Sequence, residues 1–153
     1  MEKLSGDLIN FFGNQGFIIV STIDNKKRVH CSCKGIVSID PKGEIHILDL
    51  YQGQTYKNLS FNSALSISAV DEHRFRGYCL KGKARIVRKQ ECSQEIIKAW
   101  EDKIAARITQ RLLKNIHEEK GHPRHPEVLL PEPKYLIVME IEEIIDLTAH
   151  HLR

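Results

Sequence analysis

Residues 29–39, VHCSCKGIVSI, alternate apolar or small side chains with polar ones at a period of two. Successive side chains of a β-strand point to opposite faces of the sheet, so this period predicts a strand with two distinct faces. The apolar face takes Val29, Cys31, Cys33, Val37 and Ile39, and the polar face takes His30, Ser32, Lys34 and Ser38.

Two further strands are predicted, one on each side of this stretch. The β-branched run 17–23, FIIVSTI, ends in the polar cluster DNKK, and the run 44–50, EIHILDL, follows the sequence DPKG. Proline fixes φ at the second position of a turn and glycine accepts a positive φ, so DPKG predicts a tight turn. The strand at 44–50 is therefore expected to fold back on the strand at 29–39 as a hairpin.

The rest of the chain contains three more predicted strands and three helices. Helical spacing of apolar residues marks the first dozen residues, and residues 51–62 predict a loop running into a short helix. Ser93 caps the longest helix, which extends to Lys120 and ends at Gly121 and Pro123. Its apolar stripe is Ile97, Trp100, Ile104, Ile108, Leu112 and Ile116. The further strands are 64–70, 77–87 with a bend at Gly82, and 134–147, which follows a proline-rich loop.

This pattern predicts a mainly β fold of the α+β class, with six antiparallel strands and one long helix before the last strand. A barrel fits the pattern, and so do other antiparallel sheets. A chain of 153 residues suits a single domain spanning residues 1–153.

The composition excludes several classes of protein. Hydrophobic residues make up 41% and charged residues 28%, which is the balance of a globular chain and not of a disordered one. The formal net charge of +3 is too small to indicate a nucleic-acid protein by itself. No apolar run reaches the roughly 18–20 residues of a membrane-spanning helix. Without a recognisable signal peptide, the four cysteines are expected to be reduced thiols in the cytoplasm.

The segments HCSCK (30–34) and GQTYKNL (53–59) are the best candidates for a binding site. Alternation places the Ser32 hydroxyl between His30 and Lys34 on one strand face, and charge-assisted hydrogen bonds to phosphate are strong. Thr55 lies near the start of the short helix, where backbone N–H groups are free to bind an anion. The two segments suggest a phosphate site, but taken without other information they favour an ordinary hydroxyl on a solvated strand and an ordinary cap on a surface helix.

The order of these segments resembles the pyridoxamine 5'-phosphate oxidase-like family of FMN-binding split β-barrels. The resemblance runs from FIIVSTI to KYLIVMEIEEIIDL, covering most of residues 17–147. Its most specific motifs are TYKNL, with Thr55, Asn58 and Leu59, and KGKA at 81–84. The resemblance implies a six-stranded antiparallel split barrel of the Greek-key type.

The resemblance also implies a function. In that family FMN lies in a groove between the two subunits of a homodimer, and the flavin carries the redox chemistry. We therefore expect an FMN-dependent oxidase or reductase that reacts with a small-molecule substrate or a nicotinamide donor. The implied phosphate and ring contacts are Cys31, Ser32, Lys34, Gln54, Thr55, Lys57 and Asn58, and the implied ribityl or ring contacts are Asp49, Leu50 and Tyr51. The substrate-binding Arg and His of true pyridoxamine phosphate oxidases have no counterpart in residues 134–153, so that substrate is not predicted.

Two other functions stay open at this point. One is a deazaflavin-dependent reductase on the same barrel, because the family also includes members that use a deazaflavin or bind haem. The other is a non-enzymatic barrel that binds nucleic acid or another ligand through a basic region. That region comprises Arg74, Arg76, Lys81, Lys83, Arg85, Arg88 and Lys89. Few aromatic residues accompany these charges, so nucleic-acid binding is the less favoured interpretation.

The cysteines and histidines do not predict a metal site. Cys31 and Cys33 are one residue apart, whereas structural zinc sites have two to four intervening residues and a second ligand pair. We expect these two cysteines to be small buried side chains. His122 and His125 are expected in a solvent-exposed loop, and a further hypothesis places His150 and His151 over the flavin edge of a partner subunit.

Overall fold

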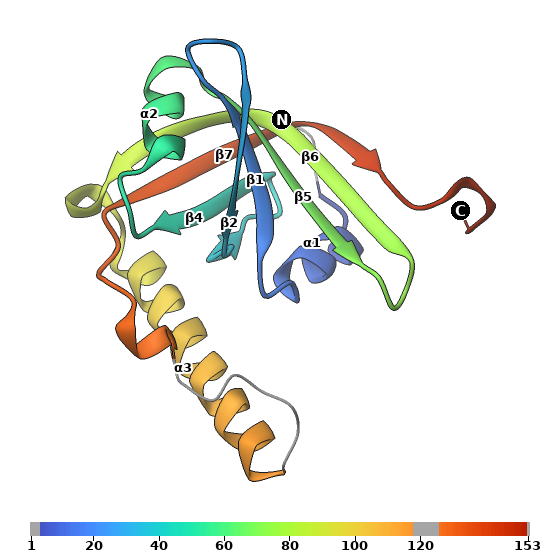
Figure 1. Cartoon of the computed structure of the whole chain (residues 1–153), viewed down its shortest axis with the longest axis vertical. Helices are drawn as coiled ribbons and strands as arrows, with labels where there is room; N and C mark the ends of the chain where they lie inside the picture. Colours follow the sequence, from blue (N-terminus) through green and yellow to red (C-terminus); the bar gives the residue numbers. More distant parts are fainter. Residues whose placement is uncertain (1–3, 118–125, 153) are drawn as a thin grey trace.

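Seven strands form one continuous antiparallel sheet in the computed structural model, which describes residues 4–117 and 126–152. Their order across the sheet is β2 (Val29–Lys34), β1 (Ile18–Ile23), β5 (Ala64–Asp71), β6 (Arg76–Arg88), β7 (Tyr135–Asp146), β4 (Glu44–Asp49) and β3 (Ser38–Ile39). The sheet curls into a barrel (Figure 1). Within the described ranges no backbone pairing joins the edge strands β2 and β3, so the barrel is split. The predicted α+β split-barrel fold is confirmed.

The seventh strand arises because the predicted strand at 29–39 is interrupted at residues 35–37. Ile36 and Val37 are neighbours in the sequence, and both are buried although they lie on opposite sides of the sheet. Ile36 joins the core inside the barrel, and Val37 joins a second apolar cluster on the outer side of the sheet. The chain leaves the sheet after β2 and enters it again as β3 at the opposite edge.

Two glycines shape the sheet where the sequence predicted a turn and a bend. Gly43 closes the turn between β3 and β4 with a φ of 103°, in the region that favours glycine. Gly82 lies at a β-bulge in the pairing of β6 with β7. A Cβ atom at Gly82 would lie 1.9 Å from the carbonyl oxygen of Glu140, so only glycine fits there.

Strand β7 is buried on both faces over its first half. Ile137, Met139 and Ile141 point into the barrel core. Leu136 and Val138 point outward and pack beneath the first turns of α3. The outer cluster fixes where α3 meets the barrel.

In the described part of the chain three α-helices accompany the sheet: α1 (Gly6–Gly13), α2 (Gln54–Phe61) and α3 (Gln94–Ile116). The Ser93 hydroxyl caps α3 by accepting the N–H of Ile96 at 3.4 Å. The first part of the α3 stripe packs on the outer cluster through Trp100 and its neighbours, and the C-terminal turns of the helix project away from the barrel (Figure 1). The predicted end of this helix at Lys120 to Pro123 lies outside the described residues.

Short 3-10 segments complete the chain as η1 (Lys89–Glu91), η2 (Pro126–Leu129) and η3 (His150–Leu152). In the described part of the chain, no helix is both long enough and apolar enough to cross a membrane.

Candidate functional site

The inner face of β2 meets the start of α2. The Ser32 and Thr55 hydroxyl oxygens are 3.0 Å apart, and Thr55 is buried. The residue before α2 is Gly53, which supplies no side chain to cap the helix. The first backbone N–H groups of α2 therefore have no side-chain cap, and they lie beside two hydroxyl groups.

A chain of polar side chains, buried at Thr22 and Asn58, holds α2 against the barrel. The Gln54 amide donates to Asn58 Oδ1 at 2.7 Å, and the Asn58 amide donates to Thr22 Oγ1 at 2.9 Å. Thr22 and Asn58 are each only 2% exposed. Because an unsatisfied buried amide is costly, this chain fixes the position of α2 relative to β1.

A second polar cluster lies at the end of β4. Lys34 Nζ is 2.6 Å from Asp49 Oδ2, and the Tyr135 hydroxyl donates to the same oxygen. The Tyr51 N–H donates to Asp49 Oδ1 at 3.2 Å. Burial, together with the adjacent Asp49 carboxylate, raises the pKa of Tyr135 well above its ordinary value, so its hydroxyl stays a donor. The Lys34 and Asp49 charges largely offset each other.

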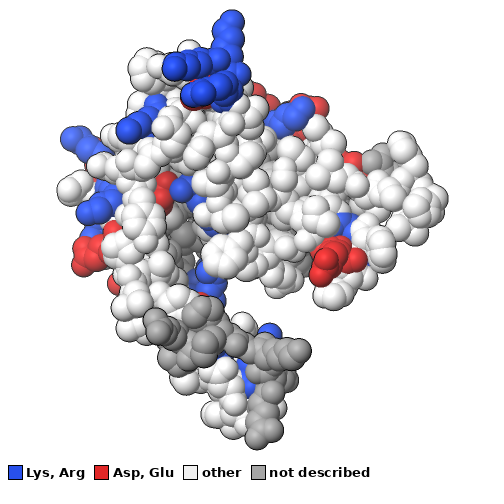
Figure 2. All heavy atoms as spheres, in the orientation of Figure 1, with Lys and Arg blue, Asp and Glu red and all other residues white. Residues whose placement is uncertain are grey.

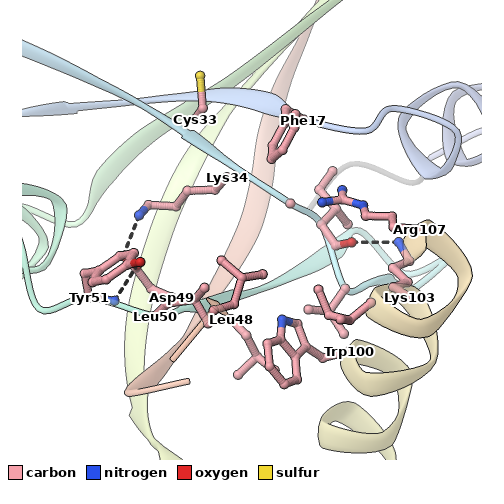
Figure 3. Close-up of a pocket in the computed structure, with 15 residues that line it drawn as sticks. Phe17, Cys33, Lys34, Leu48, Asp49, Leu50, Tyr51, Trp100, Lys103 and Arg107 are labelled. Atoms are coloured by element: carbon pink, nitrogen blue, oxygen red, sulfur yellow. Dashed lines mark hydrogen bonds and ion pairs between the residues drawn. The ribbon is translucent and has the colours of Figure 1, made fainter. Parts of the chain in front are cut away.

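A cavity of about 210 Å³ extends from this cluster to α3 (Figure 3). Lys34 and Asp49 lie at one end, and Lys103 and Arg107 lie at the other, with Trp100 at the side. The full lining is Phe17, Cys33, Lys34, Gly35, Ile36, Val37, Leu48, Asp49, Leu50, Tyr51, Trp100, Lys103, Ile104, Arg107 and Leu130. Its walls come from the segment before β1, the ends of β2 and β4, and one face of α3.

The structure gathers most of the residues expected at the site and separates one of them. Ser32 and Thr55 meet at the start of α2, whereas Lys34, Asp49, Leu50 and Tyr51 line the cavity. Asn58 lies behind them, and the Gln54 and Lys57 residues are exposed on α2. Cys31 lies on the outer face of β2, where its sulfur is 3.4 Å from Ser21 Oγ, and it does not meet the others.

The expectation that Cys31 and Cys33 are buried is wrong, because both are exposed. Their alternation with Ser32 and Lys34 is as predicted, but it is the polar face of β2 that turns inward. Figure 3 shows the Cys33 sulfur pointing away from the cavity. Within the described residues, no group of three or more His, Cys, Asp or Glu side chains could hold a metal ion.

Sequence reasoning missed five residues that shape the site: Phe17, Trp100, Lys103, Arg107 and Tyr135. A signal for two of them was present in α3. Lys103 and Arg107 are four residues apart, and they flank Ile104 of the apolar stripe. Residues at this spacing share one helix face, so the sequence places two basic residues beside a surface that packs on the barrel.

The basic region along β6 and its two flanking segments is interleaved with acidic side chains. All seven of its Lys and Arg residues lie within 3.7 Å of a carboxylate oxygen, as in the pairs Lys81–Glu143 and Lys83–Glu142. In the view of Figure 2, Lys and Arg side chains gather instead at the tip of the β1–β2 hairpin, where Lys26, Lys27 and Arg28 are exposed. A continuous basic track along β6 is therefore absent from the described residues.

The four histidines considered in the sequence analysis do not line the cavity in the described residues. His150 and His151 are exposed in η3. His122 and His125 lie outside the described residues.

Comparison with known proteins identifies relatives of the chain. The family model described as pyridoxamine 5'-phosphate oxidase matches residues 7–145. No curated protein matches the chain.

Several solved structures share the fold at low identity. HupZ of Group A Streptococcus, in the form of a single-residue variant, is 21% identical with a TM-score of 0.63, over 94% of this chain and 98% of HupZ. An FMN-binding protein from Syntrophomonas wolfei subsp. wolfei is 18% identical with a TM-score of 0.58, over 94% of this chain and 83% of that one. The heme storage protein HutZ of Vibrio cholerae is 15% identical with a TM-score of 0.54, over 94% of each chain.

Proposed function

Because the chain belongs to the pyridoxamine 5'-phosphate oxidase family, we propose that it is an FMN-binding flavoprotein of the oxidase or reductase type. The observation that carries the proposal is the pair of hydroxyl groups, Ser32 and Thr55, 3.0 Å apart beside the uncapped start of α2. A phosphate group needs a cluster of hydrogen-bond donors of this kind.

The residues present fit the phosphate of FMN. The Ser32 and Thr55 hydroxyl groups share one hydrogen bond, which leaves one of them as a donor beside the first N–H groups of α2, and the helix dipole favours a negative charge at that end. The ammonium group of Lys57 lies on the exposed face of the same helix, within its first turn. Lys34 contributes less positive charge than its position suggests, because Asp49 is bound to it.

The isoalloxazine and ribityl groups would lie toward Asp49, Leu50 and Tyr51, which continue from the phosphate site into the cavity. Bound FMN would supply hydride or electron transfer with a small organic molecule or a nicotinamide donor. The chain would bind and orient it. Asp49 keeps Lys34 and the Tyr135 hydroxyl in fixed positions at the cavity wall.

A homodimer with the cofactor in the groove between two subunits is part of this proposal. The presence of an FMN-binding protein among the structural neighbours supports the choice of cofactor. The ion pairs along β6 favour a flavoprotein over a nucleic-acid protein, because the basic charges there are already offset by carboxylates.

The test is an absorption spectrum of the purified protein after FMN is added and the excess removed. Flavin bands that stay with the protein support the proposal, and fluorescence quenching of FMN then gives the dissociation constant. We expect Thr55→Val to weaken FMN binding by about 1–3 kcal/mol, because a hydrogen bond to a charged group is lost. Ser60→Ala is the matched control, since it removes an exposed hydroxyl from the same helix.

Other spectra would contradict FMN as the cofactor. A Soret band retained after incubation with haem, without flavin bands, would place this protein functionally with HutZ, which is a heme storage protein. Retention of a deazaflavin in preference to FMN would indicate the deazaflavin-dependent alternative. Equal FMN affinity in the Thr55→Val and Ser60→Ala variants would mean that the phosphate binds elsewhere.

A further inference from the structure

A serine and a histidine form a close pair on the outer face of the barrel. Ser38 of β3 lies opposite His46 of β4 in the antiparallel pairing, and Ser38 Oγ is 2.9 Å from His46 Nδ1. Ile45 and Ile47 of β4 point into the barrel core, so His46 between them points outward. Within the described residues, this pair belongs neither to the cavity beside α3 nor to the hydroxyl pair at the start of α2.

Glu44 adds a third side chain to the pair. It lies two residues before His46 on the same face of β4, and its Oε2 atom is 3.9 Å from His46 Nε2. A neutral imidazole that turns its Nε2–H toward this carboxylate keeps Nδ1 as the acceptor for the Ser38 hydroxyl proton. An Arg85 nitrogen lies 3.6 Å from the other Glu44 oxygen and helps to hold the carboxylate in place. The order hydroxyl, imidazole, carboxylate is the one that activates the nucleophile of serine hydrolases.

The surroundings of His46 keep its imidazole able to accept a proton. Burial lowers the pKa of His46 below its ordinary value of 6.5, and the charge of Arg85 acts in the same direction. Glu44 and Asp40 act in the opposite direction. The imidazole is therefore neutral at pH 7, which is the state that a general base needs.

The pair opens onto a groove of about 480 Å³ between the β3–β4 hairpin and the start of α3. The apolar part of its wall is formed by Ile39, Pro41, Ile96 and Ala99. In the described part of the chain, the Lys, Arg, Asp and Glu side chains that line it are both acidic, Asp40 and Glu95. A groove with this lining accepts a small uncharged molecule and repels an anion.

The start of α3 adds backbone donors to the groove. Ser93 and Glu95 line it, and the Ser93 hydroxyl is already used to cap the Ile96 N–H. The N–H groups of the residues between Ser93 and Ile96 have no acceptor within the helix, and the helix dipole favours negative charge at this end. Donors of this kind stabilise the oxyanion that forms when a hydroxyl group adds to a carbonyl group.

We propose that this groove is an esterase site for small uncharged carboxylic esters, with Ser38 as the nucleophile, His46 as the general base and Glu44 as the residue that positions His46. Ser38 Oγ attacks the ester carbonyl while its proton moves to His46 Nδ1. That proton leaves with the alcohol, and the acyl group stays on Ser38. Water, which gives its proton to His46, then releases the carboxylic acid and restores the hydroxyl group. No step uses FMN, so the site is independent of the proposed function.

A fluorophosphonate identifies the nucleophile directly, because it forms a bond to an activated serine oxygen and loses fluoride. The experiment incubates the purified protein with diisopropyl fluorophosphate and locates the modified residue by peptide mass spectrometry. We expect the label on Ser38, at a rate that falls as the pH drops through the pKa of His46, which lies below 6.5. An unlabelled Ser38, or equal labelling of other serines, would overturn the proposal.

Variants test the roles of the pair with 4-nitrophenyl acetate as the substrate. Ser38→Ala and His46→Gln should each lower the rate above the buffer background by about 100-fold or more, which is within the range of general-base catalysis. Ser68→Ala is the matched control, because Ser68 is also half-buried on the outer face of a strand but pairs with Ile19 and Cys79. Circular dichroism checks that each variant is folded. Equal rates in Ser38→Ala and Ser68→Ala would contradict the proposal.

Glu44→Gln distinguishes a positioning role from a structural one. It should lower the rate by about tenfold or more, because the imidazole tautomer is no longer fixed. It should also move the midpoint of the pH profile to lower pH, since Glu44 raises the pKa of His46. An unchanged midpoint would show that Glu44 does not act on His46.

The substrate class is tested with a pair of esters that differ in charge. We expect methyl 4-acetoxybenzoate, which is uncharged, to be hydrolysed faster than 4-acetoxybenzoate, because Asp40 and Glu95 line the groove. Equal rates for the two esters, each corrected for its rate in buffer, would show that the groove does not select uncharged substrates.

Discussion

Helix α2 has eight residues and buries Thr55, Asn58 and Leu59, whereas α3 has 23 residues and buries none. Both helices border the candidate site, but they are attached to the barrel differently. A buried polar chain fixes α2 to β1, whereas α3 is held along its first half by an apolar cluster and by hydrogen bonds from Lys103 and Arg107 to backbone carbonyl groups. Length therefore says little about how firmly a helix is held, and the shorter helix is the better support for a binding group.

The largest expected effect tests the attachment of α2. Asn58→Ala removes two side-chain hydrogen bonds and leaves Thr22 without its partner in the core. We expect a loss of about 3 kcal/mol in the free energy of unfolding, measured by urea denaturation. Ser60→Ala on the exposed face of α2 should change it by less than about 0.5 kcal/mol. A similar change in the two variants would show that the polar chain does not hold α2.

A smaller effect distinguishes the two halves of α3. Ile97 packs on the outer cluster, whereas Leu112 of the same stripe is 45% exposed. We expect Ile97→Ala to cost about 1–2 kcal/mol and Leu112→Ala less than about 0.5 kcal/mol. Urea denaturation at two protein concentrations gives the answer. A large, concentration-dependent loss in Leu112→Ala would instead mean that a second copy covers this part of α3.

The smallest effect concerns the charge on α3. Burial lowers the pKa of Lys103 below its ordinary value of 10.5, so the unfolded chain binds the proton more tightly than the folded one. The free energy of unfolding should therefore rise with pH as the pH approaches 10.5, relative to Lys103→Met. Comparing the two proteins at neutral and high pH isolates the contribution of Lys103 to the free energy of unfolding, because the contribution of Tyr135 is the same in both. An unchanged difference would show that the Lys103 ammonium is as well solvated when folded as when unfolded.

Local patterns predicted the parts of the fold that depend on local chemistry. The alternation of β2, the Ser93 cap and the bend at Gly82 all follow from sequence spacing or from the nature of one residue. The interruption at 35–37 was missed because the alternation along residues 29–39 is the same whether the stretch forms one strand or two. In the structure β2 pairs with β1 and β3 pairs with β4, at opposite edges of the sheet, and only the assembled sheet shows this separation.

The candidate site also contains residues that the sequence could indicate and residues that it could not. Ser32 was indicated by the alternation along its strand and Thr55 by its place at the start of a helix, and the family resemblance supported both. The family resemblance placed Cys31 with them, because a resemblance gives the position of a residue in the sequence but not the face of the strand on which its side chain lies. Lys103 and Arg107 lie about 70 residues beyond Lys34. Only the packing of α3 brings them into the same cavity.

The gap between the edge strands gives the barrel a preferred direction of expansion. Neighbouring strands elsewhere share ladders of backbone hydrogen bonds, so they cannot separate without breaking several at once. Across the gap the strands are joined by side-chain contacts such as Lys34 with Asp49. A change in the circumference of the barrel is therefore concentrated at this gap. There β2 can move away from β3 and β4 while all the backbone hydrogen bonds between paired strands stay intact.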